Sequence, residues 1–310
     1  MKTQPAPRNA DCERLNRQYG APGRIVFRPS NHDAPIVVLA NQYGSAEVSL
    51  YGAQTISYRP TGNPPVLYMP HPYDETPVGQ EIHGGIPVCW PWFARNGPEG
   101  STIHGLARYA RWRVIGSEYS EDATEITLAC ASDDATRAAW PHDFALELKV
   151  TLSMKLTLVL RATNTGTDAF HVSEGFHPYF LVRDRDQTDV RGVDGCEFTD
   201  TNEPDIGPRT WTGDYEVRGS GSKIYTVTKR EYVLMDHGLN RAIAIVSRGN
   251  SRLVVWNPGV ESANQPEFGV DGWRKFVCVE PCSTPSDAGY DLQPGEHHDL
   301  VMAVQSVAKT

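Results

Sequence analysis

Short runs in which apolar and polar residues alternate recur along the whole chain. Residues 25–27, 36–39 and 46–50 form three short strand-like runs near the start, and Gly, Pro, Asn and Asp separate them. A period of two is typical of strands with one buried face, and the separating residue types favour turns. This pattern predicts short consecutive β-strands rather than helices.

The middle of the chain contains two longer runs that predict a β-hairpin. Residues 144–152 and 156–162 are joined only by Ser153-Met154-Lys155, and the turn signal Asn164-Thr165-Gly166 follows them. A short helix is expected only from Asp134 to Trp140. Other strands are predicted at residues 125–129, 232–235, 242–246, 253–256, 276–279 and 300–304.

Many strands with frequent turns favour an all-β fold, either a sandwich or a barrel, and the 27 Gly and 23 Pro residues fit this expectation. A length of 310 residues is compatible with one large β domain. No repeat or linker marks a boundary, so residues 23–310 are expected to form a single domain. Residues 1–22 are polar and are expected to be a loose tail.

The formal net charge of −9 argues against nucleic acid or an anionic membrane as a partner, since both require a basic surface. A few arginines could still hold an anionic small molecule. No apolar run approaches the roughly 20 residues of a membrane span. The first 23 residues lack the apolar core of a signal peptide. A cytoplasmic protein is therefore expected.

Six cysteines are scattered along the chain without a short CxxC pair. In a chain of this length they are expected to be reduced thiols rather than a disulfide framework. Cys278 and Cys282 form one loose pair, and a zinc site needs further ligands. The sequence therefore predicts no metal site.

Two segments combine glycine and proline with aromatic or charged residues, as a plain strand would not. Within residues 83–93, paired glycines allow close backbone approach to a ligand, and Trp90 and Trp92 with two prolines could form an apolar wall for a sugar ring. The same segment could equally be a packed crossover between sheets. His104 and Arg108 could present donors to a polyhydroxylated or anionic ligand.

Two further segments supply candidates for proton transfer. His177 lies between two aromatic residues and before Pro178, a constrained setting that suits a proton donor with a pKa near neutrality. Glu280 ends an apolar run, where burial would raise the pKa of its carboxyl group towards that of a working base. A structural histidine and a solvent-facing glutamate are the competing interpretations. The pairs Asp236-His237 and His297-His298 are expected in surface turns.

Taken in order, these segments resemble the aldose 1-epimerase superfamily, and most closely its hexose-6-phosphate mutarotase branch. The resemblance extends from Ile25 to Val304. Its markers are GGIPVCWPWF at residues 84–93, HGLAR at 104–108, FHPYF at 176–180, WNP at 256–258, CVEP at 278–281 and LQPGE at 292–296.

The resemblance implies a large antiparallel β-supersandwich of the galactose mutarotase-like kind, with a sugar bound in a cleft on one face. It implies that His177 is the general acid and Glu280 the general base, and that neither a metal nor an organic cofactor takes part. A monomer that acts on a small sugar or sugar phosphate is expected. Its substrate-binding residues would be His83, His104, Arg108, Ser222 and Trp92.

Three positions depart from the sugar-phosphate branch. His83 replaces its usual arginine, Ile103 its usual glutamine, and Ser222 its usual substrate-binding aspartate. Arg108 remains of the usual binding set, and one arginine alone makes a weak phosphate site. The cations that could compensate are His83, Arg95, Arg111 and Lys223.

We therefore expect a mutarotase that interconverts the α and β anomers of an aldohexose, with a hexose 6-phosphate as the expected substrate. The alternatives are a free-aldose 1-epimerase and a non-catalytic carbohydrate-binding protein with the same fold. A glycoside-processing enzyme would need a second carboxylate near Glu280, for which Glu174 and Asp214 are the candidates.

Overall fold

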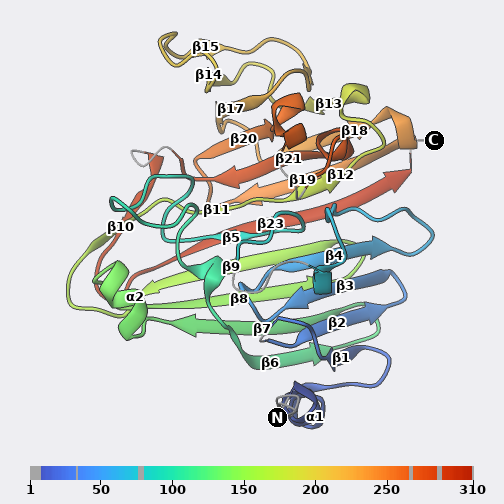
Figure 1. Ribbon diagram of the computed structural model, residues 1–310, viewed down its shortest axis with the longest axis vertical. Helices are drawn as coiled ribbons and strands as arrows, with labels where there is room; N and C mark the ends of the chain where they lie inside the picture. The colour runs from blue at the N-terminus through green and yellow to red at the C-terminus, as the bar shows by residue number, and fades with distance from the viewer. Residues whose placement is uncertain (1–7, 33, 76–79, 265–267, 285–287, 309–310) are drawn as a thin grey trace.

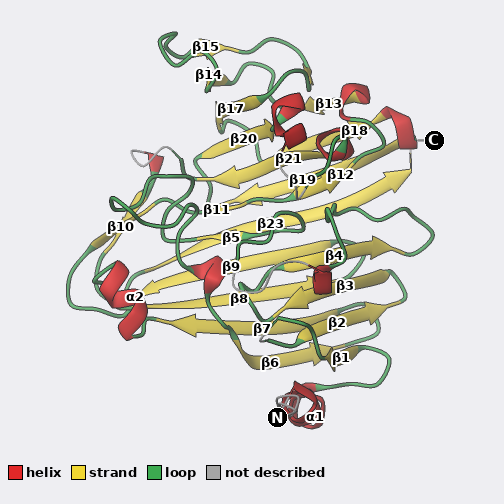
Figure 2. Ribbon diagram, viewed as in Figure 1, coloured by secondary structure: helices red, strands yellow, loops and turns green. Residues whose placement is uncertain are grey.

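The computed structural model describes residues 8–32, 34–75, 80–264, 268–284 and 288–308, and β-strands dominate it (Figures 1 and 2). In this part of the chain nine strands form the largest sheet, and all of its pairings are antiparallel. In pairing order its strands are β16 (Tyr215–Glu216), β13 (Thr188–Arg191), β18 (Glu231–Asp236), β19 (Arg241–Arg248), β23 (His297–Ala308), β9 (Leu156–Asn164), β8 (Phe144–Leu152), β7 (Thr124–Ala131) and β6 (Arg113–Tyr119).

A second antiparallel sheet has eight strands within the described residues. In pairing order they are β15 (Arg209–Thr210), β14 (Glu197–Asp200), β17 (Gly221–Thr226), β20 (Arg252–Asn257), β21 (Phe276–Cys282), β11 (Gly175–Phe176) and β5 (Val88–Cys89), and β12 (Tyr179–Leu181) also pairs with β21. Smaller sheets contain β1 (Ile25–Arg28), β2 (Ile36–Asn41), β3 (Gly44–Ser49) and β4 (Thr55–Pro60), and the pair β10 (Phe170–Val172) and β22 (Tyr290–Leu292).

Helices are short in the described residues and lie at the periphery (Figure 2). The α-helices are α1 (Arg8–Tyr19) and α2 (Asp134–Ala139). The 3₁₀ helices are η1 (Tyr73–Glu75), η2 (Ala107–Tyr109), η3 (Arg185–Gln187), η4 (His237–Leu239), η5 (Gly259–Asn264) and η6 (Gly272–Lys275). Among the described residues, no helix combines the length and apolarity that a membrane span requires.

The hairpin of β8 and β9 shows how the alternating pattern becomes a packed layer. The apolar side chains of β8 are buried at every second position, while the intervening polar residues are more exposed. β9 repeats the pattern, so both strands present one apolar face, and β2 and β3 pack against β7 and β8. One apolar cluster joins residues of the nine-, eight- and four-stranded sheets. The predicted strands, the hairpin and the helix near residue 134 are all confirmed.

The expected loose tail is wrong for residues 8–19, which form α1. Cys12 and Leu15 are each only 4% exposed and belong to the central apolar cluster. The side chain of Asn16 fastens the helix to β1, because it accepts a hydrogen bond from the Phe27 amide and donates one to the Phe27 carbonyl, both at 2.8 Å. Two apolar side chains and one amide therefore anchor an otherwise polar segment.

Two residues expected at the surface are part of the interior instead. The carboxylate of Asp236 is completely buried and forms an ion pair of 3.3 Å with Arg241, which is also buried. His298 Nδ1 lies 2.8 Å from the fully buried Glu174 Oε1, so this pair joins β23 to the chain just before β11. Charged residues near turns can point inward when the tertiary fold supplies an opposite charge.

Candidate active site

A cavity of about 290 Å³ is lined by residues of the eight-stranded sheet, among them Tyr179 on β12 and Glu280 on β21. β21 pairs with both β11 and β12, and Figure 1 shows where these strands lie. Small-molecule sites commonly measure roughly 300–1,000 Å³, so this cavity has the size of a site for one monosaccharide-sized ligand. Its lining residues are Glu81, His83, Phe93, Ala94, Ile103, His104, Arg108, His177, Tyr179, Thr201, Ser222, Ile224, Val254, Trp256, Glu280 and Thr284.

The cavity brings together the two residues predicted to transfer protons. His177 Nε2 lies 3.6 Å from Glu280 Oε2. Both side chains are buried, with Glu280 only 1% exposed. His177 Nδ1 and Glu280 Oε1 have no hydrogen-bond partner among the described residues. Two polar groups of opposite acid–base character therefore face the same small space with capacity to bind a ligand.

The position of Glu280 follows from the alternation of side chains along β21. Val277 and Val279 point into the apolar cluster between the sheets, so Cys278 and Glu280 point to the other face, where the cavity lies. Every residue of β21 is nonetheless buried. Burial raises the pKa of the Glu280 carboxyl group well above its usual value. A solvent-facing glutamate at a strand end is therefore excluded.

Aromatic rings fix the orientation of His177. Its ring stacks on Tyr179 at a centroid distance of 4.9 Å and lies nearly parallel to Phe93 at 6.1 Å. Trp256 meets it edge-on at 5.6 Å. Burial lowers the pKa of His177 well below its usual value. The imidazole is thus held rigidly and in a neutral form.

Gly175 makes room for this arrangement. A Cβ atom at this position would lie 2.6 Å from the Phe93 ring and 2.7 Å from the Cys282 Cβ atom. Both distances are shorter than van der Waals contact allows. Because Gly175 has no side chain, Phe93 can pack over β11 and reach the ring of His177.

His104 enters the cavity from a strained turn and in a defined tautomer. It has a φ of +63°, a region that is unusual for a residue other than glycine. The Ala94 amide donates a hydrogen bond of 3.0 Å to His104 Nδ1, so the ring proton is on Nε2. Burial, followed by nearby cations, lowers the pKa of His104 to about 3. A neutral His104 can therefore donate from Nε2 to a ligand oxygen.

One part of the lining contains Arg108, His83 and the carboxylate of Glu81. Arg108, only 4% exposed, comes from η2, and its Nη1 lies 3.5 Å from Glu81 Oε2. His83 Nε2 lies 3.4 Å from Glu81 Oε1. The hydrogen bond with His83 is the main cause that lowers the pKa of Glu81 to about 2. Glu81 was not found from the sequence, although His83 lies two residues later, on the same side of an extended chain.

The structure places four of the five predicted substrate-binding residues in the lining: His83, His104, Arg108 and Ser222. Trp92 does not fit its predicted role, because it lies in the apolar cluster outside this lining and donates from Nε1 to the Thr102 carbonyl. Phe93, Tyr179 and Trp256 supply the aromatic wall instead.

The paired glycines serve the protein backbone rather than a ligand. Gly84 has a φ of +117° and Gly85 one of +60°. A Cβ atom on Gly85 would lie 2.3 Å from the Thr55 carbonyl oxygen, and one on Gly84 would lie 2.8 Å from the Tyr68 carbonyl oxygen. The two glycines thus let this segment pack closely against β4 and its extension, as the crossover interpretation expected.

The other cations proposed to compensate for lost phosphate ligands do not line this cavity. Arg111 forms an ion pair of 2.8 Å with Asp11 in α1. Lys223 pairs with Asp200 on the neighbouring strand. Arg95 is exposed and outside the lining. Of the four candidates, only His83 is available here.

A glycoside-processing enzyme would need a second carboxylate near Glu280, and neither Glu174 nor Asp214 provides it. Glu174 is paired with His298, and Asp214 lies 3.2 Å from Arg191. Neither lines the cavity. Glu81 is the carboxylate that shares the lining with Glu280, and it is held by Arg108 and His83.

Potential metal ligands also occur in the site. One ligand atom each from His177, Cys278 and Glu280 lie within 4.8 Å of one another. Burial raises the pKa of both Cys278 and Glu280 well above their usual values. These surroundings favour the protonated groups, whereas a zinc ion binds thiolate and carboxylate. A metal ion at this place would therefore have to displace the protons of Cys278 and Glu280.

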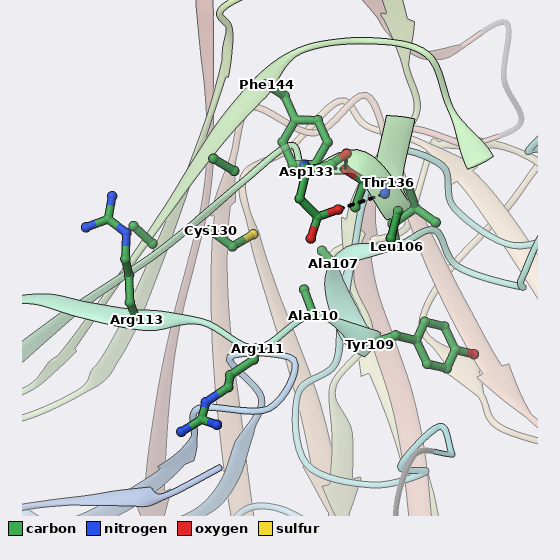
Figure 3. A pocket seen from close by; sticks show the side chains of 13 residues that line it. Leu106, Ala107, Tyr109, Ala110, Arg111, Arg113, Cys130, Asp133, Thr136 and Phe144 are labelled. Carbon is green, nitrogen blue, oxygen red and sulfur yellow. Dashed lines mark hydrogen bonds between the residues drawn. The ribbon is translucent and has the colours of Figure 1, made fainter. Parts of the chain in front are cut away.

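A second cavity, of about 490 Å³, lies on the other side of η2 (Figure 3). Ala107, Ala110 and Cys130 form its floor, and Arg111 and Arg113 lie at its edge. The carboxylate that borders it, Asp133, caps α2 through a hydrogen bond from the Thr136 amide. Although larger, this cavity contains no pair of facing acid and base among the described residues.

The chain is similar in sequence to proteins that are named as sugar epimerases. The profile of the family described as aldose 1-epimerase matches residues 35–305. A Salmonella typhimurium protein provisionally named glucose-6-phosphate 1-epimerase is 30% identical over 260 residues, which are 83% of this chain and 85% of that protein. An Escherichia coli K12 protein of the same name is 29% identical over the same shares.

Solved structures agree on the fold. A provisionally named mutarotase from Salmonella typhimurium matches with a TM-score of 0.83 and 27% identity, covering 92% of this chain and 94% of that chain. A galactose 1-epimerase from Lactobacillus acidophilus matches with a TM-score of 0.72 and 14% identity, covering 92% and 98%. The expected antiparallel, galactose mutarotase-like architecture is confirmed.

Proposed function

The chain belongs to the aldose 1-epimerase family of isomerases, and from this premise we propose that His177 and Glu280 interconvert the α and β anomers of an aldohexose. The observation that carries the proposal is their buried pairing, with 3.6 Å between His177 Nε2 and Glu280 Oε2, in a cavity of monosaccharide size. An acid and a base so placed can act on two oxygens of one ring.

The reaction needs one proton removed and one delivered. Glu280 takes the proton from the C1 hydroxyl group while His177 protonates the ring oxygen, and the C1–O5 bond breaks. Rotation about the C1–C2 bond turns the other face of the aldehyde towards O5. The reverse proton transfers then close the ring as the other anomer. His104, with its proton on Nε2, is placed to donate to a sugar oxygen during these steps.

The buried pair of His177 and Glu280 can hold one shared proton in two ways. Burial favours a neutral carboxyl on Glu280 and a neutral imidazole on His177. Moving one proton from Glu280 to His177 gives the ion pair, which has the same total number of protons. The ion-paired form supplies the base and the acid that ring opening requires, and the neutral form is the state that ring opening leaves, so the cycle needs no uptake or loss of a proton.

We further propose a hexose 6-phosphate as substrate. The curated relatives are provisionally named glucose-6-phosphate 1-epimerase, and Arg108 and His83 supply cations within the lining. Arg108 is the type of residue that binds phosphate oxygens through two parallel hydrogen bonds. The cytoplasmic location and the monomeric state remain predictions from the sequence.

Purified protein is expected to accelerate the interconversion of α- and β-glucose 6-phosphate, measured by exchange NMR or by polarimetry. The rate constant should rise in proportion to enzyme concentration above the spontaneous rate. The same assay with glucose tests the free-aldose alternative. Binding of either sugar without acceleration would reject the proposed function and support a non-catalytic carbohydrate-binding protein.

The pH dependence of kcat should show a plateau over the range in which the His177–Glu280 pair holds one proton. Activity should fall on the acid side and on the alkaline side of this range. At low pH the pair gains a proton when His177 is protonated, and the lowered pKa of His177 places this loss of activity below the ordinary range of imidazole. At high pH the pair loses a proton from Glu280, and its raised pKa places this loss above the ordinary range of a carboxyl group. An acid limb at or above about pH 6.5, or an alkaline limb at or below about pH 4.3, would contradict this account, because these are roughly the unshifted values.

A further inference from the structure

Glu81 lies between the two cations of the cavity. Its Oε1 is 3.4 Å from His83 Nε2, and its Oε2 is 3.5 Å from Arg108 Nη1. Tyr109 donates a hydrogen bond of 3.3 Å to the same Oε2. The pKa of about 2 means that Glu81 is ionised at neutral pH. A ligand that reaches this end of the cavity therefore meets a carboxylate together with the cations.

Arg108 and His83 are the side chains of the lining that could donate hydrogen bonds to a phosphate group on the sugar. Arg111 and Lys223 are paired with Asp11 and Asp200, away from the lining, and Arg95 is exposed outside it. A further buried contact holds the guanidinium group of Arg108 in place, because its Nη2 donates a hydrogen bond of 3.5 Å to the Ile82 carbonyl oxygen. Glu81 thus occupies nitrogen atoms of Arg108 and His83 to which a substrate phosphate group would bind.

We propose that Glu81 is a specificity-determining residue whose carboxylate competes with a substrate phosphate group for Arg108 and His83, and so moves the preference of the site towards unphosphorylated aldohexoses. The inference rests on the proposed function, because it concerns how the same site ranks its substrates. Two anions can share one guanidinium group only against their mutual repulsion. A neutral sugar avoids this repulsion and finds in Glu81 an acceptor for its hydroxyl groups.

Glu81→Gln keeps the size of the side chain and removes its charge. We expect the Kd of glucose 6-phosphate, measured by calorimetric titration, to fall roughly tenfold, since like charges placed together in a binding site oppose binding strongly. The Kd of glucose should stay the same or rise, because an acceptor becomes weaker. In steady-state assays the change should appear in KM and not in kcat, since His177 and Glu280 are untouched.

Two further variants separate competition from other effects. Glu81→Asp retains the charge and should keep the wild-type ratio of the two Kd values. Glu118→Gln removes the same charge from an exposed position of β6 and should change neither Kd. The side chain of Glu81 is 31% exposed, so the substitution leaves the core intact, and an unchanged unfolding midpoint checks this.

An unchanged or higher Kd for glucose 6-phosphate in Glu81→Gln would overturn the proposal, because Glu81 would then be arranging Arg108 for the phosphate. An equal fall in Glu118→Gln would overturn it as well, by showing a general effect of net charge. Titration measures binding without turnover. A wild-type protein that binds both sugars but does not interconvert anomers would reject the proposed function, and the Kd comparison would still decide the role of Glu81.

Discussion

Glu280→Gln is expected to lower kcat for anomer interconversion by about 10²–10⁴-fold, the usual contribution of a well-placed general acid or base. The amide has nearly the same shape as the carboxyl group but cannot take the proton from the C1 hydroxyl group. Glu81, the other carboxylate in the lining, is paired with Arg108 and His83. The sugar should still bind, with a Kd close to that of the wild type.

Exchange NMR at a series of enzyme concentrations measures this loss, and calorimetric titration measures the Kd. Glu197→Gln is the matched control, since Glu197 is exposed on β14 of the same sheet. His177→Asn should cause a comparable loss, and the double variant should be little worse than either, because the two groups act as a unit. A Glu280→Gln enzyme that retains more than about a tenth of wild-type kcat would contradict the assigned role.

Arg241→Met is expected to lower the free energy of unfolding by about 3–5 kcal/mol, because it leaves a buried carboxylate without its partner. Asp236 is completely buried, 3.3 Å from Arg241 Nε. The guanidinium group also donates to the carbonyls of Pro65, at 2.8 Å, and Leu181. Methionine fills much of the space of arginine but restores none of these interactions.

Denaturant unfolding provides the measurement, and Arg248→Met is the control, because Arg248 is the exposed last residue of the same strand. If the unpaired charge is the main cause, the double variant Asp236→Asn with Arg241→Met should recover part of the lost stability. A change below about 1 kcal/mol for Arg241→Met would show that the pair is no more valuable than a surface ion pair.

The alternating pattern was enough to predict most of the long strands. In β8 and β9 every second residue is apolar, and the structure buries these positions. Strands of two or three residues were missed, because they are too short to show a period of two. β4, β6 and β17, which have six or seven residues, were missed as well. β15 and β16 have only two residues each and exist because longer neighbours provide their hydrogen bonds.

α1 was missed for a related reason. Its sequence is polar except at Cys12, Leu15 and Tyr19, so the chain carries only a narrow apolar stripe. What stabilises the helix is its contact with β1 through Asn16 and the apolar cluster. Such a contact joins residues that no local pattern connects.

His177 and Glu280, the proposed acid–base pair, were recognisable in the sequence, because each stands in an apolar context that ordinary polar residues avoid. Their separation of 3.6 Å, the opposite shifts of their pKa values and the presence of Glu81 beside Arg108 came only from the tertiary structure. That Trp256 and not Trp92 lines the cavity also came only from the tertiary structure. Local sequence determines which residues prefer burial, whereas the packing of distant strands determines which face of each strand they share and which charges meet there.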